Sequence, residues 1–293
     1  MPDGSFALPD LDLWHRRLVD FNAARFAPGA PADGWELDVE QHCAMTLEEG
    51  RWLEQRRHRV VARAAEAPRD ADGFVHWFEQ LEHTGPGQND PLFPWLAEQA
   101  TLDEMRWFLE QEVAGEAGFE DLTALTQVRL PVPAKLELAR NYWDEMGRGN
   151  ARGMHGPMLE HLARRLDLRP RVETTVWEAL ALANTMAGLA ANRRYAYQSV
   201  GALGVIEQTA PGRAKLVGEG LRRLGISGKD RHYFDLHAVL DIKHSAAWNA
   251  EAAHPLVAED PARASALAEG ALMRLECGAD CFARYRRAFN LPG

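Results

Sequence analysis

The feature that most constrains this chain is the near absence of strand-forming patterns. Runs of Val, Ile and Thr that alternate with polar residues are missing, and Ala, Leu, Glu and Arg dominate from end to end. These residues lose little conformational freedom in a helix, so their enrichment favours helix over sheet. The sequence therefore predicts an all-α fold in which short loops join amphipathic helices.

Local signals divide the chain into expected helices. Thr101 followed by Glu104 forms a capping box, and Asp260 followed by Pro261 marks the start of the last helix. Three glycines within the longest helical pattern predict a kink or close packing there. The expected helices are Leu11–Phe26, Val39–Ala67, Gly73–His83, 101–115, Ala134–Met146, Pro157–Leu168, Val172–Thr209, Pro211–Leu224, Tyr233–Ala253 and a last helix that runs to Phe289.

The length of 293 residues suits one large helical domain over 1–293. A chain of this size buries about three-quarters of its unfolded surface, enough for a dry internal cavity. Residues 1–100 carry no ligand motif and are expected to form an N-terminal helical extension packed on a metal-binding bundle at 101–293.

Charge and composition narrow the expected partners. The net charge is −10 and no run of Lys or Arg stands out, so nucleic-acid and anionic-membrane binding are not expected. Neither a signal peptide nor an apolar stretch of about 18 residues is seen, which predicts no membrane span. Three cysteines suggest no disulfide framework, so a cytoplasmic protein is expected, with Cys277 and Cys281 as buried thiols.

The strongest local motif lies in YFDLHAVLDIKHSAAW at 233–248. His237, Asp241 and His244 recur at i, i+4 and i+7, which places them within an arc of ~60° on a helix, because each residue advances about 100°. Two imidazoles and one carboxylate form the set that suits non-haem iron(II) with open positions for O2. Taken alone, the motif is better explained as a solvated helix face that carries two histidines, and the other stretches decide between the two interpretations.

A second stretch, NYWDEMGRGNARGMHGPM at 141–158, contains two more ligand-type residues. Glu145 lies in the last turn of one expected helix, and His155 lies at the start of the next. The glycines between them allow a tight turn, so the two side chains are able to converge. An ordinary glycine-rich helix–helix corner is the alternative interpretation.

Glu207 follows the apolar turn LGVI and needs a partner if it is buried, because an unpaired buried charge is costly. Arg193 on the same face is one candidate partner, and a metal ion is the other. Two Fe(II) ions carry more positive charge than three carboxylates offset, so Glu112 or Glu116 is a candidate fourth carboxylate, or an acceptor beside the ligands. The candidate ligands are Glu145, His155, Glu207, His237, Asp241 and His244.

Together these stretches resemble the haem-oxygenase-like di-iron oxidases and oxygenases, a group often called iron-containing redox enzymes. The pattern of that family is a Glu, a downstream His, a later Glu and then H-x3-D-x2-H. Glu145, His155, Glu207 and the motif at 237–244 match it in order, over roughly 101–248. The resemblance implies a haem-oxygenase-like helical bundle with additional N-terminal helices, two Fe(II) ions per chain and O2 as co-substrate.

The resemblance also implies an activity. The expected protein is an O2-dependent non-haem di-iron enzyme acting on a small amine, an amino-acid-like molecule or a fatty acid, by N-oxygenation, desaturation or oxidative C–C cleavage. Glu207 is the expected bridging carboxylate, with Glu145 and His155 on one iron and 237–244 on the other. A homodimer and an external electron donor are further expected partners.

A tier of polar residues near these motifs is expected to line a substrate pocket. Tyr142, Arg193 and Tyr197 belong to it, and Arg193 is placed to take a substrate carboxylate. A fatty-acid pocket would instead be mostly apolar at this level.

The sequence disfavours one alternative, a ferritin-like site, and leaves two others open. A ferritin-like site needs an E-x-x-H motif on each of two helices, but Asp241–His244 and Glu251–His254 fall on one expected helix and face different directions. A metal-independent thiaminase-like or cofactor-synthesis enzyme would use Cys, Glu and Tyr chemistry on the same scaffold. A non-enzymatic helical binding protein would expose the histidines of the motif.

Overall fold

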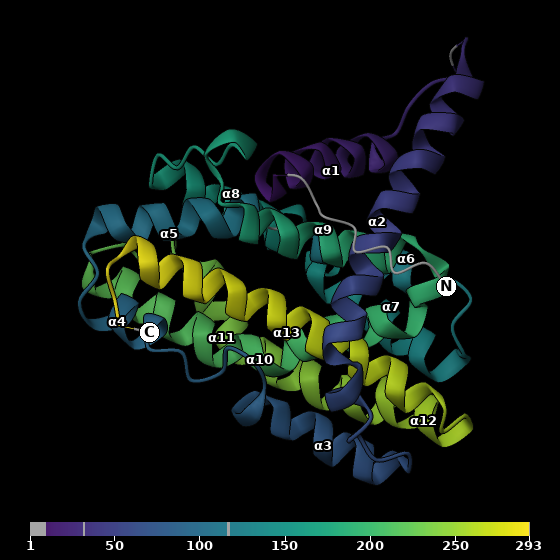
Figure 1. Cartoon of the computed structure of the whole chain (residues 1–293). Helices are drawn as coiled ribbons and strands as arrows, with labels where there is room; N and C mark the ends of the chain where they lie inside the picture. The colour runs from purple at the N-terminus through teal and green to yellow at the C-terminus, as the bar shows by residue number, and fades with distance from the viewer. Residues whose placement is uncertain (1–9, 32, 116–117, 293) are drawn as a thin grey trace.

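Helices make up the regular structure of the residues that this computed structural model describes, 10–31, 33–115 and 118–292. No strand occurs among them, so the predicted all-α class is confirmed. The helices, labelled in Figure 1, are α1 (Leu11–Phe26), α2 (Trp35–Ala64), α3 (Ala71–Thr84), α4 (Leu92–Glu98), α5 (Leu102–Ala114), α6 (Phe119–Thr126), α7 (Val132–Glu145), α8 (His155–Arg165), α9 (Trp177–Ala191), α10 (Ala196–Arg223), α11 (His232–Trp248), α12 (His254–Glu259) and α13 (Arg263–Ala288).

Helix α10 is the element on which the bundle is assembled. It packs most extensively on α11 and α13, and Figure 1 shows α13 lying across it. Two glycines permit the close crossing of α10 and α13. A Cβ atom on Gly201 would lie 1.9 Å from the carbonyl oxygen of Leu267, and one on Gly270 would lie 1.8 Å from that of Gln198. The glycines therefore set the separation of these two helices.

The segment 172–209, predicted as one helix, forms two. α9 ends before Asn192, whose side chain accepts a hydrogen bond of 3.0 Å from the backbone N–H of Arg194 and so starts a new turn. The sequence also predicts a break at Pro211, but α10 continues through this residue. A proline inside a helix costs about 3 kcal/mol, and the packing of α10 on α11 and α13 outweighs that local cost.

The segment 233–253 also departs from the predicted single helix. α11 is followed by a π-helical turn, Asn249–Ala253, and the chain then enters α12. Pro255 lies in the first turn of α12, directly after the π-helical turn, and its lack of an N–H removes one hydrogen bond where the helical pattern changes. Asp260 caps the turn that precedes α13 rather than the helix itself, since its Oδ1 accepts from the N–H of Ala262 at 3.0 Å.

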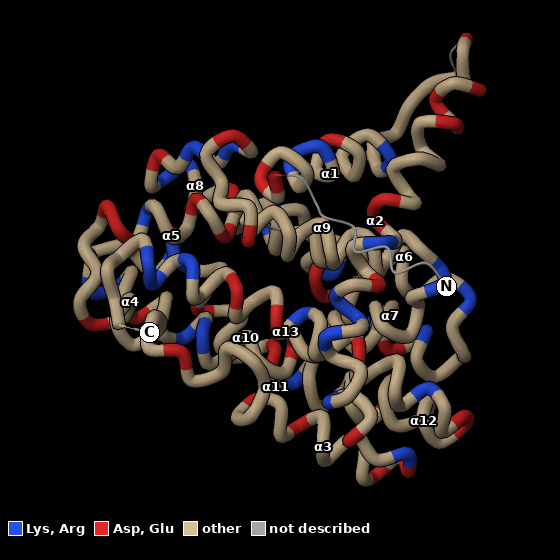
Figure 2. Tube along the Cα trace, in the orientation of Figure 1, with Lys and Arg blue, Asp and Glu red and all other residues tan. Residues whose placement is uncertain are grey.

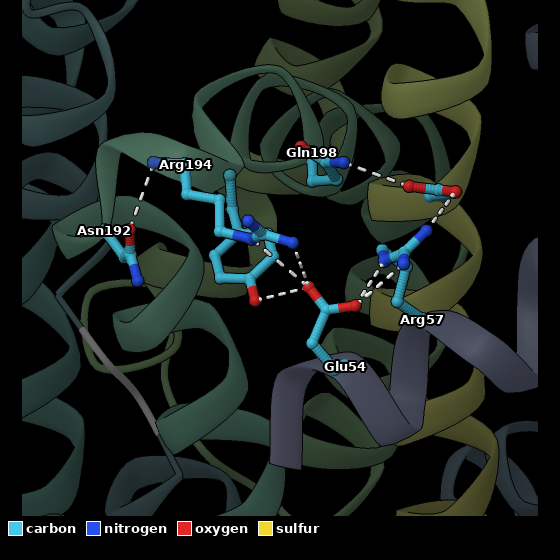
Figure 3. A network of polar contacts seen from close by, with 7 residues as sticks. Glu54, Arg57, Asn192, Arg194 and Gln198 are labelled. Atoms are coloured by element: carbon cyan, nitrogen blue, oxygen red, sulfur yellow. Dashed lines mark hydrogen bonds and ion pairs between the residues drawn. The ribbon is translucent and has the colours of Figure 1, made fainter. Parts of the chain in front are cut away.

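The N-terminal helices are held to the bundle by packing and by a polar network. α1 packs on α9, and α2 packs on α13. In Figure 3, Glu54 of α2 accepts hydrogen bonds from Arg57, Arg194 and Tyr195, and Arg57 pairs with Glu269 of α13 at 3.1 Å. Glu54 and Arg57 of α2 thus connect the turn before α10 to the middle of α13.

His15, a residue of α1, lies at the centre of a cluster of aromatic side chains. Its ring lies 4.6 Å from that of Trp52 and stacks at 5.8 Å on Trp177, and the residue is fully buried. Asn184 donates a hydrogen bond of 2.9 Å to the His15 carbonyl oxygen. Burial, together with the charge of Arg56, lowers the pKa of His15 to about 3, so the ring is neutral at pH 7.

Positions of Lys and Arg and positions of Asp and Glu are interspersed along the helices in Figure 2. None of the helices at 10–31, 33–115 and 118–292 is long and apolar enough to cross a membrane. Cys277 and Cys281 are buried free thiols, as predicted, whereas Cys43 is exposed.

Replacing Gly201 or Gly270 by alanine is expected to destabilise the protein, because the new methyl group meets a backbone carbonyl that moves only if a helix shifts. Overpacking of this kind costs about 1–3 kcal/mol. Gly212→Ala on α10 is the control: nothing lies within 4 Å of its Cβ position, so we expect a neutral change or a gain of about 1 kcal/mol. Urea unfolding measures all three, and equal stabilities would refute the close-crossing argument.

The buried His15 gives the protein a stability that depends on pH. The folded pKa lies below the unfolded value of 6.5, so this contribution is present above pH 6.5 and is lost as the pH falls towards 3. The slope of the unfolding free energy against pH reaches about 1.4 kcal/mol per pH unit. We expect His15→Gln to lose less unfolding free energy than the wild type between pH 7 and pH 4.

Urea denaturation at several pH values measures this difference in slope. His83→Gln, at an exposed position, is the control and should follow the wild-type profile. A His15→Gln profile parallel to that of the wild type would show that His15 is protonated in the folded state.

Candidate metal centre

The six predicted ligands converge at one place in the bundle. Glu145 is the last residue of α7, His155 is the first residue of α8, Glu207 lies in α10, and the motif at 237–244 lies on α11. Five of the six are buried, and His237 is half-buried. Helices far apart in the sequence therefore supply one group of ligand-type side chains.

The loop 146–154 brings the first two ligands together. Its ends pair in an isolated antiparallel bridge, and Gly147 adopts a positive φ of 59°. A Cβ atom on Gly147 would lie 2.3 Å from the carbonyl carbon of Gly153, so only glycine permits this turn. As a result, His155 Nδ1 lies 2.6 Å from Glu145 Oε2.

Glu145, His155 and His237 form the first group of ligand atoms, all within 4.8 Å of one another. The rings of His155 and His237 meet edge to face, with centroids 4.6 Å apart. His237 Nδ1 lies 2.7 Å from the carbonyl oxygen of Tyr233, to which it donates. That hydrogen bond fixes the tautomer and leaves the Nε2 lone pair available to a metal.

Glu145, Glu207 and His244 form the second group within the same 4.8 Å limit. His244 Nε2 lies 3.2 Å from Asp144 Oδ2, and its Nδ1 lies 3.4 Å from Glu207 Oε2. Asn141 Nδ2 donates a hydrogen bond of 2.6 Å to Glu207 Oε1. Asp144 and Asn141 thus orient one ligand each, from the side away from the centre.

Asp241 belongs to neither group, although it lies close enough to Glu207 and Glu145 for their charges to act on it. It is 2% exposed, and its Oδ1 has no hydrogen-bond partner. Burial, then repulsion from Glu207 and Glu145, raises the pKa of Asp241 to about 9. The protein without a metal therefore keeps a proton on this carboxyl group at pH 7.

The histidines divide into two electrostatic classes. Burial, then a neighbouring histidine, lowers the pKa values of His155 and His237 to about 4, so both are neutral at pH 7. Burial also acts to lower the pKa of His244, but the carboxylate of Glu207, supported by Asp144, outweighs it and raises the value to about 9. Protons on His244 and Asp241 thus supply positive charge that a bound dication would replace.

Buried polar atoms without a hydrogen-bond partner indicate whether this group of residues could hold a metal ion. His155 Nδ1, Asp241 Oδ1 and His244 Nδ1 are all buried and lack a hydrogen-bond partner, and the contact between His155 and Glu145 lacks hydrogen-bond geometry. Each such atom costs about 1–3 kcal/mol. A divalent cation would satisfy these atoms and neutralise the carboxylates, and mixed imidazole and carboxylate donors suit iron. The residues therefore fit an iron centre.

The grouping of ligands differs from the one predicted from the sequence. Glu145, not Glu207, is common to both groups, and His155 is grouped with His237 rather than opposite it. Helix geometry explains the division, because His237 and His244 lie ~10.5 Å apart along the axis of α11. The packing of α8 on α11 then brings His155 to the His237 end.

Asp144 and Asn141 were missed by sequence reasoning. Both lie in the stretch NYWDE, with Asp144 directly before Glu145 and Asn141 one helical turn before it. The adjacency of Asp144 to a candidate ligand is a weak signal, since neighbouring residues on a helix point about 100° apart. Only the packing of α7 on α11 reveals that Asp144 reaches His244.

A cavity of about 260 Å³ extends from the ligands into the bundle. Glu112 lines it but joins neither ligand group, and accepts a hydrogen bond of 3.1 Å from the hydroxyl of Tyr285 instead. The role predicted for Glu112 as a fourth ligand therefore has no geometric support. Glu116 lies outside the described residues.

The residues predicted to line the substrate pocket lie elsewhere. Arg193 donates to the carbonyl oxygens of Leu125 and Thr126 at 3.2 and 3.1 Å, and so satisfies the end of α6. Tyr197 packs under Arg263 beside a separate surface groove. Tyr142 is half-buried on α7 and does not line the cavity. The predicted pocket was wrong because the break at 192 changes the direction in which the side chains after it point.

The sequence profile of the iron-containing redox enzymes matches residues 106–279. The chain belongs to this family. The matched region contains all six predicted ligands, and the resemblance stated from the sequence is confirmed. No curated protein sequence matches the chain.

A solved structure supports the fold of this iron-containing redox enzyme. The chain is similar to a CADD-like protein of unknown function from Nostoc punctiforme, with a TM-score of 0.53 and 15% sequence identity. The similarity covers 83% of this chain and 98% of that one. The prediction of a haem-oxygenase-like helical bundle is thereby confirmed.

Asp144→Asn is expected to weaken Fe(II) binding about 10–100-fold, because an amide is a poorer acceptor for the N–H of His244 and no longer fixes its ring. Arg148→Gln is the matched control. It breaks the exposed ion pair of 2.6 Å on the other oxygen of Asp144 and should leave Fe(II) binding close to that of the wild type. Anaerobic Fe(II) titration measures both, and an unchanged affinity in Asp144→Asn would remove the positioning role.

Proposed function

We propose that this iron-containing redox enzyme is a non-haem di-iron oxidase or oxygenase that uses O2 to oxidise a small organic substrate. The observation that carries the proposal is the double grouping around Glu145. This carboxylate lies within 4.8 Å of two imidazoles on one side and of Glu207 and His244 on the other. A carboxylate shared in this way suits two neighbouring metal ions better than one.

The residues have distinct roles in this proposal. Glu145 would bridge the two ions, with His155 and His237 on the first and Glu207 and His244 on the second. Asp241 faces Glu207 and Glu145 and would complete the second set after losing its proton. Bound iron would supply the activation of O2 and the oxidation of the substrate.

The other residues of the site would orient the ligands and exclude water. Tyr233 and Asp144 hold the tautomers of His237 and His244 through the hydrogen bonds described above. The cavity next to the ligands is lined mainly by apolar side chains, which limits the access of water to the reacting atoms. A substrate held in this cavity would lie beside the candidate ligands that line it, among them Glu145, Glu207 and His237.

Two alternative functions fit the site less well. A metal-independent enzyme would need a reactive nucleophile, but burial raises the pKa values of Cys277 and Cys281, which disfavours the thiolate. A helical binding protein would expose its histidines, whereas His244 is 6% exposed and Asp241 is 2% exposed.

Metal stoichiometry tests the proposal. The wild type, purified without oxygen, is expected to bind about two Fe(II) ions per chain. Glu145→Ala should lose both ions, because the carboxylate belongs to both groups, whereas His237→Ala and His244→Ala should each lose one. Metal analysis by mass spectrometry, after removal of free iron, measures these ratios.

The control is Glu160→Ala, an exposed glutamate on α8 that pairs with Arg164 on the surface. It should retain wild-type iron content. Mixing the Fe(II)-loaded wild type with O2 should give a transient visible absorption. A wild-type chain that binds no iron, or single variants that all keep two ions, would refute the proposed function.

A further inference from the structure

The cavity has a second polar end, away from the metal ligands. Arg213 of α10 and Arg274 of α13 line it, together with Glu112 of α5 and Tyr285 of α13. Most of the remaining lining is apolar. It includes Phe93, Phe108, Leu109, Leu182, Met186 and Ile206.

The cavity runs along helix α10. Glu207 and Arg213 both line it, and six residues correspond to ~9 Å along the helix axis. Ala210 and Ala214 also line it and provide only small side chains there. The space therefore follows α10 from a metal ligand to a guanidinium group.

The charges at the second end are not paired. The guanidinium of Arg213 donates to two neutral acceptors, Thr209 Oγ1 at 3.1 Å and Gln88 Oε1 at 3.5 Å. Within residues 10–31, 33–115 and 118–292, Arg274 makes no hydrogen bond or ion pair, and neither arginine forms an ion pair with Glu112. Two guanidinium groups thus face the cavity with no carboxylate bound to them.

This arrangement is unfavourable for the protein alone. Burial, then repulsion from Arg274, lowers the pKa of Arg213 to about 9. Burial also raises the pKa of Glu112, which weakens the one negative charge nearby. An anion between the two arginines would relieve their repulsion, and the guanidinium fork matches the two oxygens of a carboxylate.

We propose that the substrate carries a carboxylate that binds between Arg213 and Arg274, and that its apolar chain extends along α10 towards the metal ligands. The atom that reacts is then remote from the carboxylate. The position of this reacting atom rests on the proposed function, whereas the carboxylate subsite rests on the two arginines alone. The subsite replaces Arg193, which the sequence suggested for this role.

The first test compares ligands of one chain length. Octanoate, octanol and octylamine are titrated into the full chain by calorimetry, with Fe(II) under anaerobic conditions and without metal. We expect octanoate to bind at least tenfold more tightly than octanol under both conditions, and octylamine to bind most weakly. Equal affinities for octanoate and octanol would overturn the proposal.

The second test locates the carboxylate. Arg213→Gln and Arg274→Gln should each weaken octanoate binding about 10–100-fold, as expected for the loss of a hydrogen bond to a charged group. Octanol binding and the iron content should not change. The control is Arg222→Gln, an exposed arginine on α10, which should bind octanoate like the wild type.

The outcomes separate the two proposals. Folded variants with unchanged octanoate affinity would place the carboxylate at the metal ligands and overturn the subsite. If either substitution prevents folding, the ligand comparison in the wild type decides. A wild type that binds octanoate through the arginines but binds no iron would refute the di-iron function and leave the carboxylate subsite in place.

Discussion

The constraint on which this structure depends is the burial of three carboxylates and three imidazoles at one place. Carboxylates at such short range repel one another, which is expressed in the raised pKa of Asp241. A bundle holds them together only if other residues orient them and if positive charge is present. Asn141 and Asp144 provide the orientation, and protons or metal ions provide the charge.

Small residues of α10 serve opposite purposes on different faces of that helix. Gly201 allows the backbone of α13 to approach, and Gly204 admits the indole of Trp248, which a Cβ atom would meet at 2.4 Å. On the face towards the cavity, Ala210 and Ala214 leave space that no protein side chain fills. The same helix is therefore tightly packed where it supports the fold and open where a substrate would enter.

The sequence was sufficient for the helical class and for the family, and it named six ligand-type residues that the fold brings close together. Residue type and spacing carry that information, because His237, Asp241 and His244 share a helix face whatever surrounds them. The division of ligands between two groups was not predictable, since it depends on how α8 packs against α11. The break before α10 was also missed, and it changes which way Arg193 points.

The two arginines that line the cavity show the same limit of prediction from a single sequence. Arg213 and Arg274 lie on different helices, and neither belongs to a recognisable motif. Only the packing of α10, α13 and α5 brings them to one cavity beside Glu112. Two half-buried guanidinium groups without a carboxylate partner are recognised only when the neighbouring helices are known, and a single sequence does not show those neighbours.

The adjacency of Asp144 and Glu145 has a consequence for how this protein can evolve. Two consecutive residues at the end of α7 contribute to the candidate centre in different ways, Glu145 as a candidate ligand and Asp144 through its contact with His244. Inserting or deleting a single residue earlier in α7 would rotate both by about 100° and withdraw them together. We therefore expect related chains to vary in α7 by substitution of exposed residues rather than by insertion or deletion.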